Sequence, residues 1–368
     1  MSVDKSAQPA SFGIVLQVED ESDSYRTSKP VNIEIIDPHS GGSWQQDKTG
    51  YWYLWPDGTY PRNGFETIDG DVYYFNNSGY RVTSWQQIGG KWYYFDSDGI
   101  MQTDWQNIGG ARYYFNEEGA MLSGWQEIDG DWYYFNSGGA MQKNWQQLGG
   151  KWYYFDGDGI MQTSWQDLSG ARYYFDEDGA MQTGWQEIDG DWYYFGSGGA
   201  MARSWQQVGG TWYYFDSDGK MVTGLQELSG KYYYFDAGGA MKTGWRQIDG
   251  DWYYFNAGGD AKTGWLQSGK AWYYFDGDGK MLTGLQEIEQ SKYYFDASGA
   301  MKTGWQQVGD DWYYFESGGA AARSKWVGNY YMKESGVMAR NEWVDGERYY
   351  VGDDGLWIPG YTESTAVN

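Results

Sequence analysis

A 20-residue repeat constrains the fold of this chain more than any other feature of its sequence. Residues 124–142 read GWQEIDGDWYYFNSGGAMQ, and about a dozen edited copies of this segment follow one another. Tryptophans recur every 20 residues from Trp85 to Trp205, and glycines recur on the same count from Gly79 to Gly319. Such spacing marks an array of one small supersecondary unit packed against its neighbours. We therefore expect a repeat fold instead of the two or three domains that 368 residues would otherwise suggest.

Each repeat is predicted to be a β-hairpin. Residues 125–128 and 131–135 are rich in aromatic and β-branched side chains, and Asp129-Gly130 between them suits a two-residue turn with positive φ. With that turn, residue 128 pairs with 131, 127 with 132 and 125 with 134. Because side chains alternate across a strand, Trp125 and Trp132 share one face of the hairpin and Phe135 lies on the other. The two tryptophans are then diagonal neighbours within reach of one ligand.

The composition supports a non-enzymatic repeat array. Aromatic residues make up 21% of the chain although its mean hydropathy is −0.77. A 20-residue hairpin cannot bury its own rings, so neighbouring hairpins must cover them. The formal charge of −25 argues against nucleic acid as a partner and is compatible with attracting cations. No cysteine and only one histidine, His39, are present, so we expect no catalytic residues, no metal site and no cofactor.

The two ends of the chain differ from its middle. Residues 1–43 lack the repeat, and we interpret them as the remnant of an upstream domain or as an N-terminal cap, with strands expected at 12–18 and 31–36. Residues 44–319 carry the hairpin repeats, and residues 320–368 are expected to form irregular terminal repeats and a cap. No charged segment followed by an apolar stretch opens the chain, so we see no secretory signal and expect a fragment of a surface protein.

A longer rhythm of 60 residues lies over the repeat of 20. The second tryptophan of the hairpin is replaced at Arg112, Arg172, Tyr232 and Lys292, and Asp-x-Asp-Gly turns recur at the same interval from Asp96 to Asp276. Three hairpins per superhelical turn would explain the rhythm, and so would duplication of a 60-residue block. The Asp-x-Asp-Gly turns also suggest calcium, but the further ligands of a calcium loop are missing, and Asp and Gly are ordinary turn residues.

The repeat resembles the choline-binding repeats of Gram-positive surface proteins and phage lysins. The pattern G-W-Q-x-(I/L/V)-x-G-x-W-Y-Y-F-(D/N)-x-x-G-x-M-x-T-G-W extends roughly from Trp44 to Trp357. Related glucan-binding and clostridial toxin repeats share the Y-Y-F and glycine positions but usually lack the second tryptophan, so its presence favours choline. The resemblance implies an all-β fold, a left-handed β-solenoid with about three hairpins per turn, and ligand cages between consecutive hairpins.

The family cage combines two tryptophans of one hairpin with a tyrosine and a methionine of the next. Carried onto this chain, the resemblance implies seven cages. They are Trp85, Trp92, Tyr113 and Met121; Trp125, Trp132, Tyr153 and Met161; Trp145, Trp152, Tyr173 and Met181; Trp185, Trp192, Tyr213 and Met221; Trp205, Trp212, Tyr233 and Met241; Trp245, Trp252, Tyr273 and Met281; and Trp265, Trp272, Tyr293 and Met301. Trp305 and Trp312 also pair, but the hairpin that follows them is irregular, which puts that site in doubt.

Some aromatic positions are expected to form the core, and others are expected to bind a ligand. The rings could all be core, and for Phe95, Tyr94 and Ile88 we expect this. Core packing alone would not explain why every third hairpin lacks the second tryptophan, and Arg112, Arg172 and Lys292 would place a cation where an ammonium ligand should lie. We therefore expect no choline site at those hairpins. Glu127 and Glu187 share the indole face, and we hypothesise that they strengthen their cages electrostatically.

We therefore predict a non-catalytic cell-wall-targeting module that binds the choline or phosphocholine of teichoic and lipoteichoic acids. An extracellular location at the cell wall, no membrane insertion and a homodimer through the terminal repeats are further expectations. Two alternatives stay open. One is a polysaccharide-binding array in which the tryptophans stack on sugar rings, and the other is a structural spacer or dimerising rod whose rings only pack.

Overall fold

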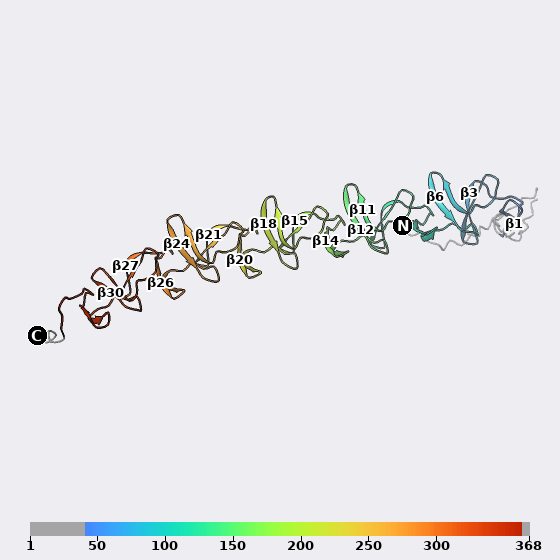
Figure 1. The fold of residues 1–368 in the computed structure, drawn as a ribbon. Coiled ribbons are helices and arrows are strands. Elements are labelled where there is room, and N and C mark those ends of the chain that lie inside the picture. Colours follow the sequence, from blue (N-terminus) through green and yellow to red (C-terminus); the bar gives the residue numbers. More distant parts are fainter. Residues whose placement is uncertain (1–40, 363–368) are drawn as a thin grey trace, which may run out of the picture. The chain divides into compact units, whose positions relative to one another are not determined.

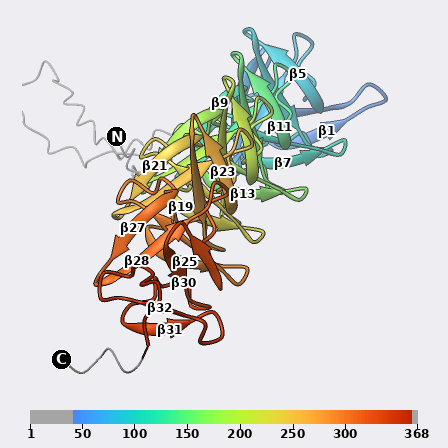
Figure 2. The same cartoon turned by 60° about the vertical axis from the view of Figure 1, so that its left-hand side comes forward.

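The computed structural model describes residues 41–362 and consists of β-hairpins that follow one another along the chain (Figure 1). Each hairpin is its own two-stranded sheet. The described residues contain no helix, and so none that could cross a bilayer. The described residues form two compact units, 41–166 with 175–181 and 167–174 with 182–362, and each unit is considered by itself. Figure 2 shows the same hairpins from a second direction.

Residues 41–362 form sixteen hairpins from thirty-two strands. Those up to the junction of the two units are β1 (Ser43–Gln46), β2 (Tyr51–Leu54), β3 (Gly64–Ile68), β4 (Asp71–Phe75), β5 (Ser84–Ile88), β6 (Lys91–Phe95), β7 (Asp104–Ile108), β8 (Ala111–Phe115), β9 (Gly124–Ile128), β10 (Asp131–Phe135), β11 (Asn144–Leu148), β12 (Lys151–Phe155), β13 (Ser164–Leu168) and β14 (Ala171–Phe175). Those that follow are β15 (Gly184–Ile188), β16 (Asp191–Phe195), β17 (Ser204–Val208), β18 (Thr211–Phe215), β19 (Gly224–Leu228), β20 (Lys231–Phe235), β21 (Gly244–Ile248), β22 (Asp251–Phe255), β23 (Gly264–Ser268), β24 (Ala271–Phe275), β25 (Gly284–Ile288), β26 (Ser291–Phe295), β27 (Gly304–Val308), β28 (Asp311–Phe315), β29 (Lys325–Val327), β30 (Tyr330–Met332), β31 (Glu342–Val344) and β32 (Tyr349–Val351).

The predicted hairpin register is confirmed. In the pair β9–β10, Ile128 lies opposite Asp131 and Trp125 lies opposite Tyr134. The two turn residues, Asp129 and Gly130, have φ angles of 55° and 91°. This double positive φ matches the right-handed twist of the flanking strands, and it explains why the turn position reads Asp-Gly, Gly-Gly or Ser-Gly.

A second turn joins each hairpin to the next. After β6, the Asp96 carboxylate accepts hydrogen bonds from the backbone amides of Asp98 and Ile100, both at 2.9 Å, and the Gly99 amide bonds to the Asp96 carbonyl at 3.1 Å. The Asp-x-Asp-Gly pattern therefore serves the backbone of the turn. Across residues 41–362 no group of three or more acidic or histidine side chains is placed to hold a metal ion.

The core is a row of phenylalanines, one at the end of the second strand of each regular hairpin. Phe95, Phe135 and Phe155 are 0% exposed, as expected for the face opposite the indoles. The glycine of the second turn has a packing role as well. Gly139 has a φ of 79°, and a Cβ atom there would stand 2.2 Å from the sulfur of Met121 in the preceding repeat. The recurring glycine thus makes room for the methionine that precedes it by 18 residues in the sequence.

Several expectations fall on the ends of the chain. The strands predicted at 12–18 and 31–36, and almost all of the segment 1–43, lie outside the described residues. At the other end, β29 to β32 continue the hairpins with strands of three residues instead of five. The division at residues 319 and 320, the left-handed winding and the number of hairpins per turn stay predictions.

Candidate functional site

We call the junction between one hairpin and the next a seam. The seam between hairpins β9–β10 and β11–β12 contains a cavity of about 210 Å³. Trp125 and Trp132 of the first hairpin line this cavity together with Tyr153 of β12 and Met161 of the following turn. The ring centres of the two indoles are 6.3 Å apart, and Tyr153 lies edge-on to Trp125 at 4.9 Å. Three aromatic rings and one thioether therefore form the nonpolar part of the cavity lining.

Backbone pairing fixes this arrangement. The Met161 amide donates a hydrogen bond to the Trp132 carbonyl at 2.8 Å, which ties the turn after one hairpin to the second strand of the hairpin before it. The hairpin register places Trp125 diagonal to Trp132 on the same face. The ring centre of Phe155, which is fully buried, lies 5.6 Å from that of Trp125, so the core packs directly against the first indole. Local turn chemistry and strand alternation thus determine where each cage residue lies.

The other predicted cages repeat this geometry. In all seven, the centres of the two indoles are 6.2–6.4 Å apart. The methionine amide bonds to the carbonyl of the second tryptophan at 2.8–2.9 Å in each. In six cages the tyrosine lies 4.8–4.9 Å from the first tryptophan, at Tyr113, Tyr153, Tyr213, Tyr233, Tyr273 and Tyr293. In the seventh cage, Trp145 and Trp152 belong to the first compact unit and Tyr173 belongs to the second. The tyrosine wall of that cage therefore stays a prediction.

A seam with two indoles is called an open seam here, and exposure distinguishes the seven predicted cages from the seams without two indoles. The second tryptophan of all seven predicted cages is 39–42% exposed. The tyrosine and the methionine of these cages are half-buried. At the hairpins that follow Arg112 and Arg172, the corresponding tyrosines, Tyr133 and Tyr193, are only 9% and 8% exposed, and Met141 and Met201 are buried. The second indole therefore stays accessible in the seven predicted cages, whereas the tyrosine and the methionine are covered in the seams of Arg112 and Arg172.

Burial is the largest cause of a raised pKa at seven described tyrosines, and all of them except Tyr53 and Tyr114 recur at intervals of 60 residues. Burial raises the pKa of a phenol above its ordinary value of 10.0 at Tyr73, Tyr133, Tyr193, Tyr253 and Tyr313. These five residues are spaced by 60 and follow the seams that lack a pair of indoles. From Tyr133 to Tyr313, the 60-residue rhythm of the sequence coincides with the positions of the buried tyrosines.

The structure also shows what fills some of the seams without two indoles, called closed seams here. The guanidinium carbon of Arg112 lies 4.1 Å from the centre of the Trp105 ring. At the first hairpin, Arg81 takes the position of the cage methionine, and its guanidinium carbon lies 5.4 Å from the Trp44 ring and 4.4 Å from the Tyr51 ring. In both seams a cation of the chain itself occupies aromatic faces that an ammonium ligand would need.

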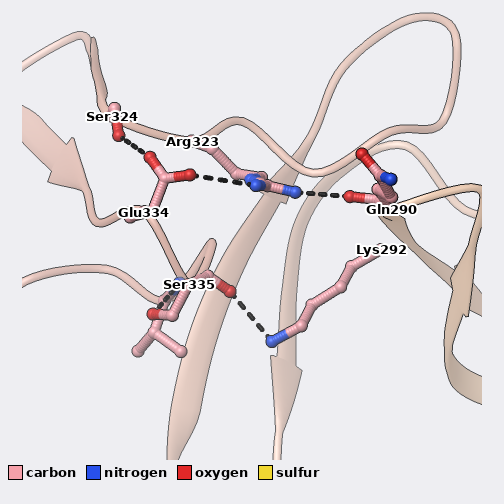
Figure 3. Close-up of polar contacts among 7 residues, drawn as sticks. Gln290, Lys292, Arg323, Ser324, Glu334 and Ser335 are labelled. Atoms are coloured by element: carbon pink, nitrogen blue, oxygen red, sulfur yellow. Dashed lines mark hydrogen bonds and ion pairs between the residues drawn. The ribbon is translucent and has the colours of Figure 1, made fainter.

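Lys292 closes a seam in a different way (Figure 3). Its ammonium group donates a hydrogen bond to the Ser335 carbonyl at 2.9 Å and lies 5.6 Å from the centre of the Tyr313 ring. Arg323 bonds to the Gln290 carbonyl in the turn of the same hairpin and to the Glu334 carboxylate at 3.0 Å. Leu285 replaces the first tryptophan here, and Ala321 replaces the methionine. The seam is therefore held by polar cross-links and lacks three of the four cage residues.

The doubtful pair, Trp305 and Trp312, also assembles with a tyrosine and a methionine, but Trp312 is half-buried and Met338 is only 6% exposed, so this seam is less accessible than the seven predicted cages. Tyr330 of β30 lies 5.1 Å from Trp305, and the Met338 amide bonds to the Trp312 carbonyl at 2.8 Å. These four residues line a cavity of about 470 Å³ together with Arg340 and Asp354. The irregular spacing of the following hairpin conceals this in the sequence, because its short strands move the tyrosine three residues nearer to Trp305.

Two carboxylates of the Trp125 cavity were missed by the sequence analysis. Glu177 and Asp178 line the cavity. Both lie in the turn after β14, two hairpins further along the chain than β9–β10. Glu127, which was expected to strengthen this cage, is exposed and is not among the described residues that line it. Asp354 has the corresponding place in the Trp305 cavity. Because these turns lie two hairpins away along the chain, pairing within one hairpin could not reveal them.

An array of β-hairpins with half-open aromatic cages at its seams defines a ligand-binding repeat module. The chain belongs to the choline-binding repeat family. One choline-binding repeat model matches six consecutive segments from residue 82 to residue 326, a second matches residues 320–357, and a putative cell wall binding repeat model matches residues 63–81. All three models describe binding repeats, and none describes a catalytic domain.

The chain is also similar to solved structures and to a curated relative. The chain is 35% identical to CbpJ from Streptococcus pneumoniae TIGR4, with 70% of this chain and 100% of that chain covered and a TM-score of 0.45. It is 34% identical to choline binding protein F from Streptococcus pneumoniae, over 70% and 98% of the two chains, with a TM-score of 0.41. A lysin of Pneumococcus phage Dp-1 is 44% identical over 41 residues, which span 11% of this chain and 14% of the lysin.

Proposed function

We propose that the open seams bind choline, and that the chain attaches to cell walls by binding several choline or phosphocholine groups of teichoic or lipoteichoic acid at once. The observation that carries this proposal is the exposure of the second tryptophan, 39–42% in all seven predicted cages. A ring used only for packing would be covered, as Tyr133 is in the seam beside Arg112. Family membership supports choline as the ligand.

The chemistry of the cage suits a quaternary ammonium. Such a cation has no N–H group to donate, so aromatic faces are its natural partners, and each cation–π contact contributes about 0.5–2 kcal/mol. Three rings then give a dissociation constant of about 1 mM per cage. The formal charge of −25 favours the approach of cations from solution. Weak single sites are sufficient on a repetitive polymer, because the first contact raises the effective concentration for the next ones.

This proposal places the protein outside the cell, at a Gram-positive wall that carries choline. The same reasoning assigns no role to nucleic acid. Association of two copies through the terminal repeats remains a prediction that the molar mass in solution tests. A polysaccharide-binding role would use the same rings by stacking them on sugars, and a spacer role would leave them without any ligand.

Tryptophan fluorescence during titration distinguishes these functions. Choline should change the emission with half-saturation at about millimolar concentration. Dextran should not change it, nor should 3,3-dimethyl-1-butanol, which has the shape of choline without its charge. A response to dextran instead would favour glycan binding. If neither compound changed the emission of the folded protein, the spacer role would replace our proposal.

A further inference from the structure

We propose that the terminal seam, between hairpins β29–β30 and β31–β32, is an additional quaternary-ammonium cage built from Trp326, Tyr349 and Trp357. This inference rests on the proposed function of the open seams. It concerns a seam in which neither the second tryptophan nor the methionine of the repeat is present at its usual place.

Backbone pairing identifies the equivalent positions. Trp326 lies opposite Tyr331 as Trp85 lies opposite Tyr94, which makes Trp326 the first tryptophan of this seam. The Trp357 amide donates to the Asn329 carbonyl at 2.9 Å, as the Met121 amide donates to the Trp92 carbonyl at 2.8 Å. Asn329 therefore stands in the place of the second tryptophan, and Trp357 stands in the place of the methionine.

In this seam, the second indole is therefore supplied by a different position of the repeat. The second indole comes from the end of the following hairpin, and the position that usually carries it holds a short amide side chain. Tyr349 keeps the tyrosine position, because Trp343 pairs with Tyr350 in the register that places Trp105 opposite Tyr114. Three aromatic walls are retained although the sequence pattern of the cage is lost.

The ring distances resemble those of an open seam, except that Tyr349 lies farther from the first tryptophan than the 4.8–4.9 Å of the regular cages and also contacts the second indole. Trp326 and Trp357 have ring centres 6.5 Å apart, close to the 6.4 Å between Trp85 and Trp92. Tyr349 lies edge-on to Trp326 at 5.5 Å and edge-on to Trp357 at 5.7 Å. Trp357 is 41% exposed, the same as Trp92, and Tyr349 is 37% exposed. In contrast to the closed seams, the rings here are accessible.

A carboxylate lies beside these rings. The Trp326 indole N–H donates to Asp345 at 3.3 Å, which places an anionic oxygen at the edge of the cluster. An ammonium group against the three ring faces would have this negative charge nearby, and no side-chain cation lies over these rings in the described part of the chain. The ligand class indicated is a small quaternary ammonium such as choline.

Fluorine NMR of the full chain labelled with 6-fluorotryptophan tests this inference. The substitution Trp357→Phe identifies the Trp357 resonance by its disappearance, and Trp132→Phe identifies a regular cage in the same way. We expect choline to shift both resonances with half-saturation within about tenfold of each other, and 3,3-dimethyl-1-butanol to shift neither. In the variant Tyr349→Ala, the response of Trp357 should weaken while that of Trp132 is retained.

The outcomes separate this inference from the proposed function. If choline shifts the Trp132 resonance and leaves Trp357 unchanged, the terminal cage is wrong and the regular cages stand. If choline shifts neither resonance, the proposed function itself fails. A Trp357 response that is unchanged in the folded Tyr349→Ala variant would also overturn the terminal cage, because the tyrosine wall would then contribute nothing.

Discussion

The guanidinium carbon of Arg112 lies 4.1 Å from the centre of the Trp105 ring, and Arg112 has the strand position that carries the second indole in an open seam. The backbone around both residues is that of an open seam, since the Met141 amide bonds to the Arg112 carbonyl at 2.8 Å, as the Met161 amide bonds to that of Trp132. Tyr133 and Met141 are also in place but buried. One side chain therefore separates a covered seam from an accessible one.

Replacing that side chain should open the seam. In the variant Arg112→Trp, the new indole joins Trp105, Tyr133 and Met141, so we expect one additional choline bound per chain. Its affinity should be of the same order as that of a regular cage, about 1 mM. Equilibrium dialysis of labelled choline against the variant and the wild type measures the difference at saturation.

The seam at Tyr232 provides a matched control. Leu225 and Ala261 stand there in place of the first tryptophan and the methionine. The substitution Tyr232→Trp adds the second indole without the other walls and should add no bound choline. Equal gains in the two variants would contradict the role assigned to the complete cage.

Removing an exposed indole should affect binding more than stability. We expect Trp132→Ala to weaken choline binding at its own cage about 2- to 30-fold, which corresponds to the loss of one cation–π contact. Because Trp132 is 42% exposed, the urea midpoint should change little. Phe135→Ala removes a ring that is 0% exposed and should cost about 3–5 kcal/mol of unfolding free energy. A larger loss of stability for Trp132→Ala than for Phe135→Ala would show that the indole is part of the core.

The carboxylates of Glu177 and Asp178 should strengthen choline binding in the Trp125 cavity. The double variant Glu177→Gln, Asp178→Asn removes two negative charges from the lining of the Trp125 cavity. An exposed charge pair contributes about 0.2–1 kcal/mol, so we expect the loss of two charges to weaken the affinity about 2- to 30-fold at low salt. The effect should be smaller at high salt, because salt screens exposed charges. The 6-fluorotryptophan resonance of Trp132 reports this cage. Glu127→Gln serves as the control and should leave the affinity unchanged.

Much of this architecture could be predicted from the sequence because it is local. The turn at Asp129-Gly130 and strand alternation determine the register, and the register places Trp125 next to Trp132. The approach of Glu177 to that cage could not be predicted, since it depends on how successive hairpins stack. Trp357 was hidden for another reason, because it serves as an indole wall from the position of the methionine. Tyr330 was hidden by the short strands of its hairpin.

One turn stores strain that a substitution should relieve. Glu289 and Gln290 have φ angles of 49° and 66°, although most hairpins place glycine at the second position. A non-glycine residue in the left-handed region costs about 1–2 kcal/mol. The added chain entropy of glycine offsets part of this, so Gln290→Gly should raise the unfolding free energy by about 1 kcal/mol. Urea unfolding measures the change, and Arg323 keeps its bond because it uses the Gln290 carbonyl.

The equivalent turn of a regular hairpin supplies the reverse substitution. Gly130 has a φ of 91° and no other atom within 4 Å of a Cβ built on it, so Gly130→Gln should be tolerated sterically. We expect it to lower the unfolding free energy by a similar amount, about 1 kcal/mol. A gain of stability for Gly130→Gln, or none for Gln290→Gly, would contradict this explanation.

The separation of accessible seams from covered ones is tested most directly by a crystal structure of the full chain with choline. We predict a trimethylammonium group between Trp125, Trp132 and Tyr153, equivalent density in the other open seams, and none between Trp105 and Arg112. Choline displacing Arg112 from the Trp105 ring, or open seams left empty at saturating choline while the ligand binds elsewhere, would contradict the account.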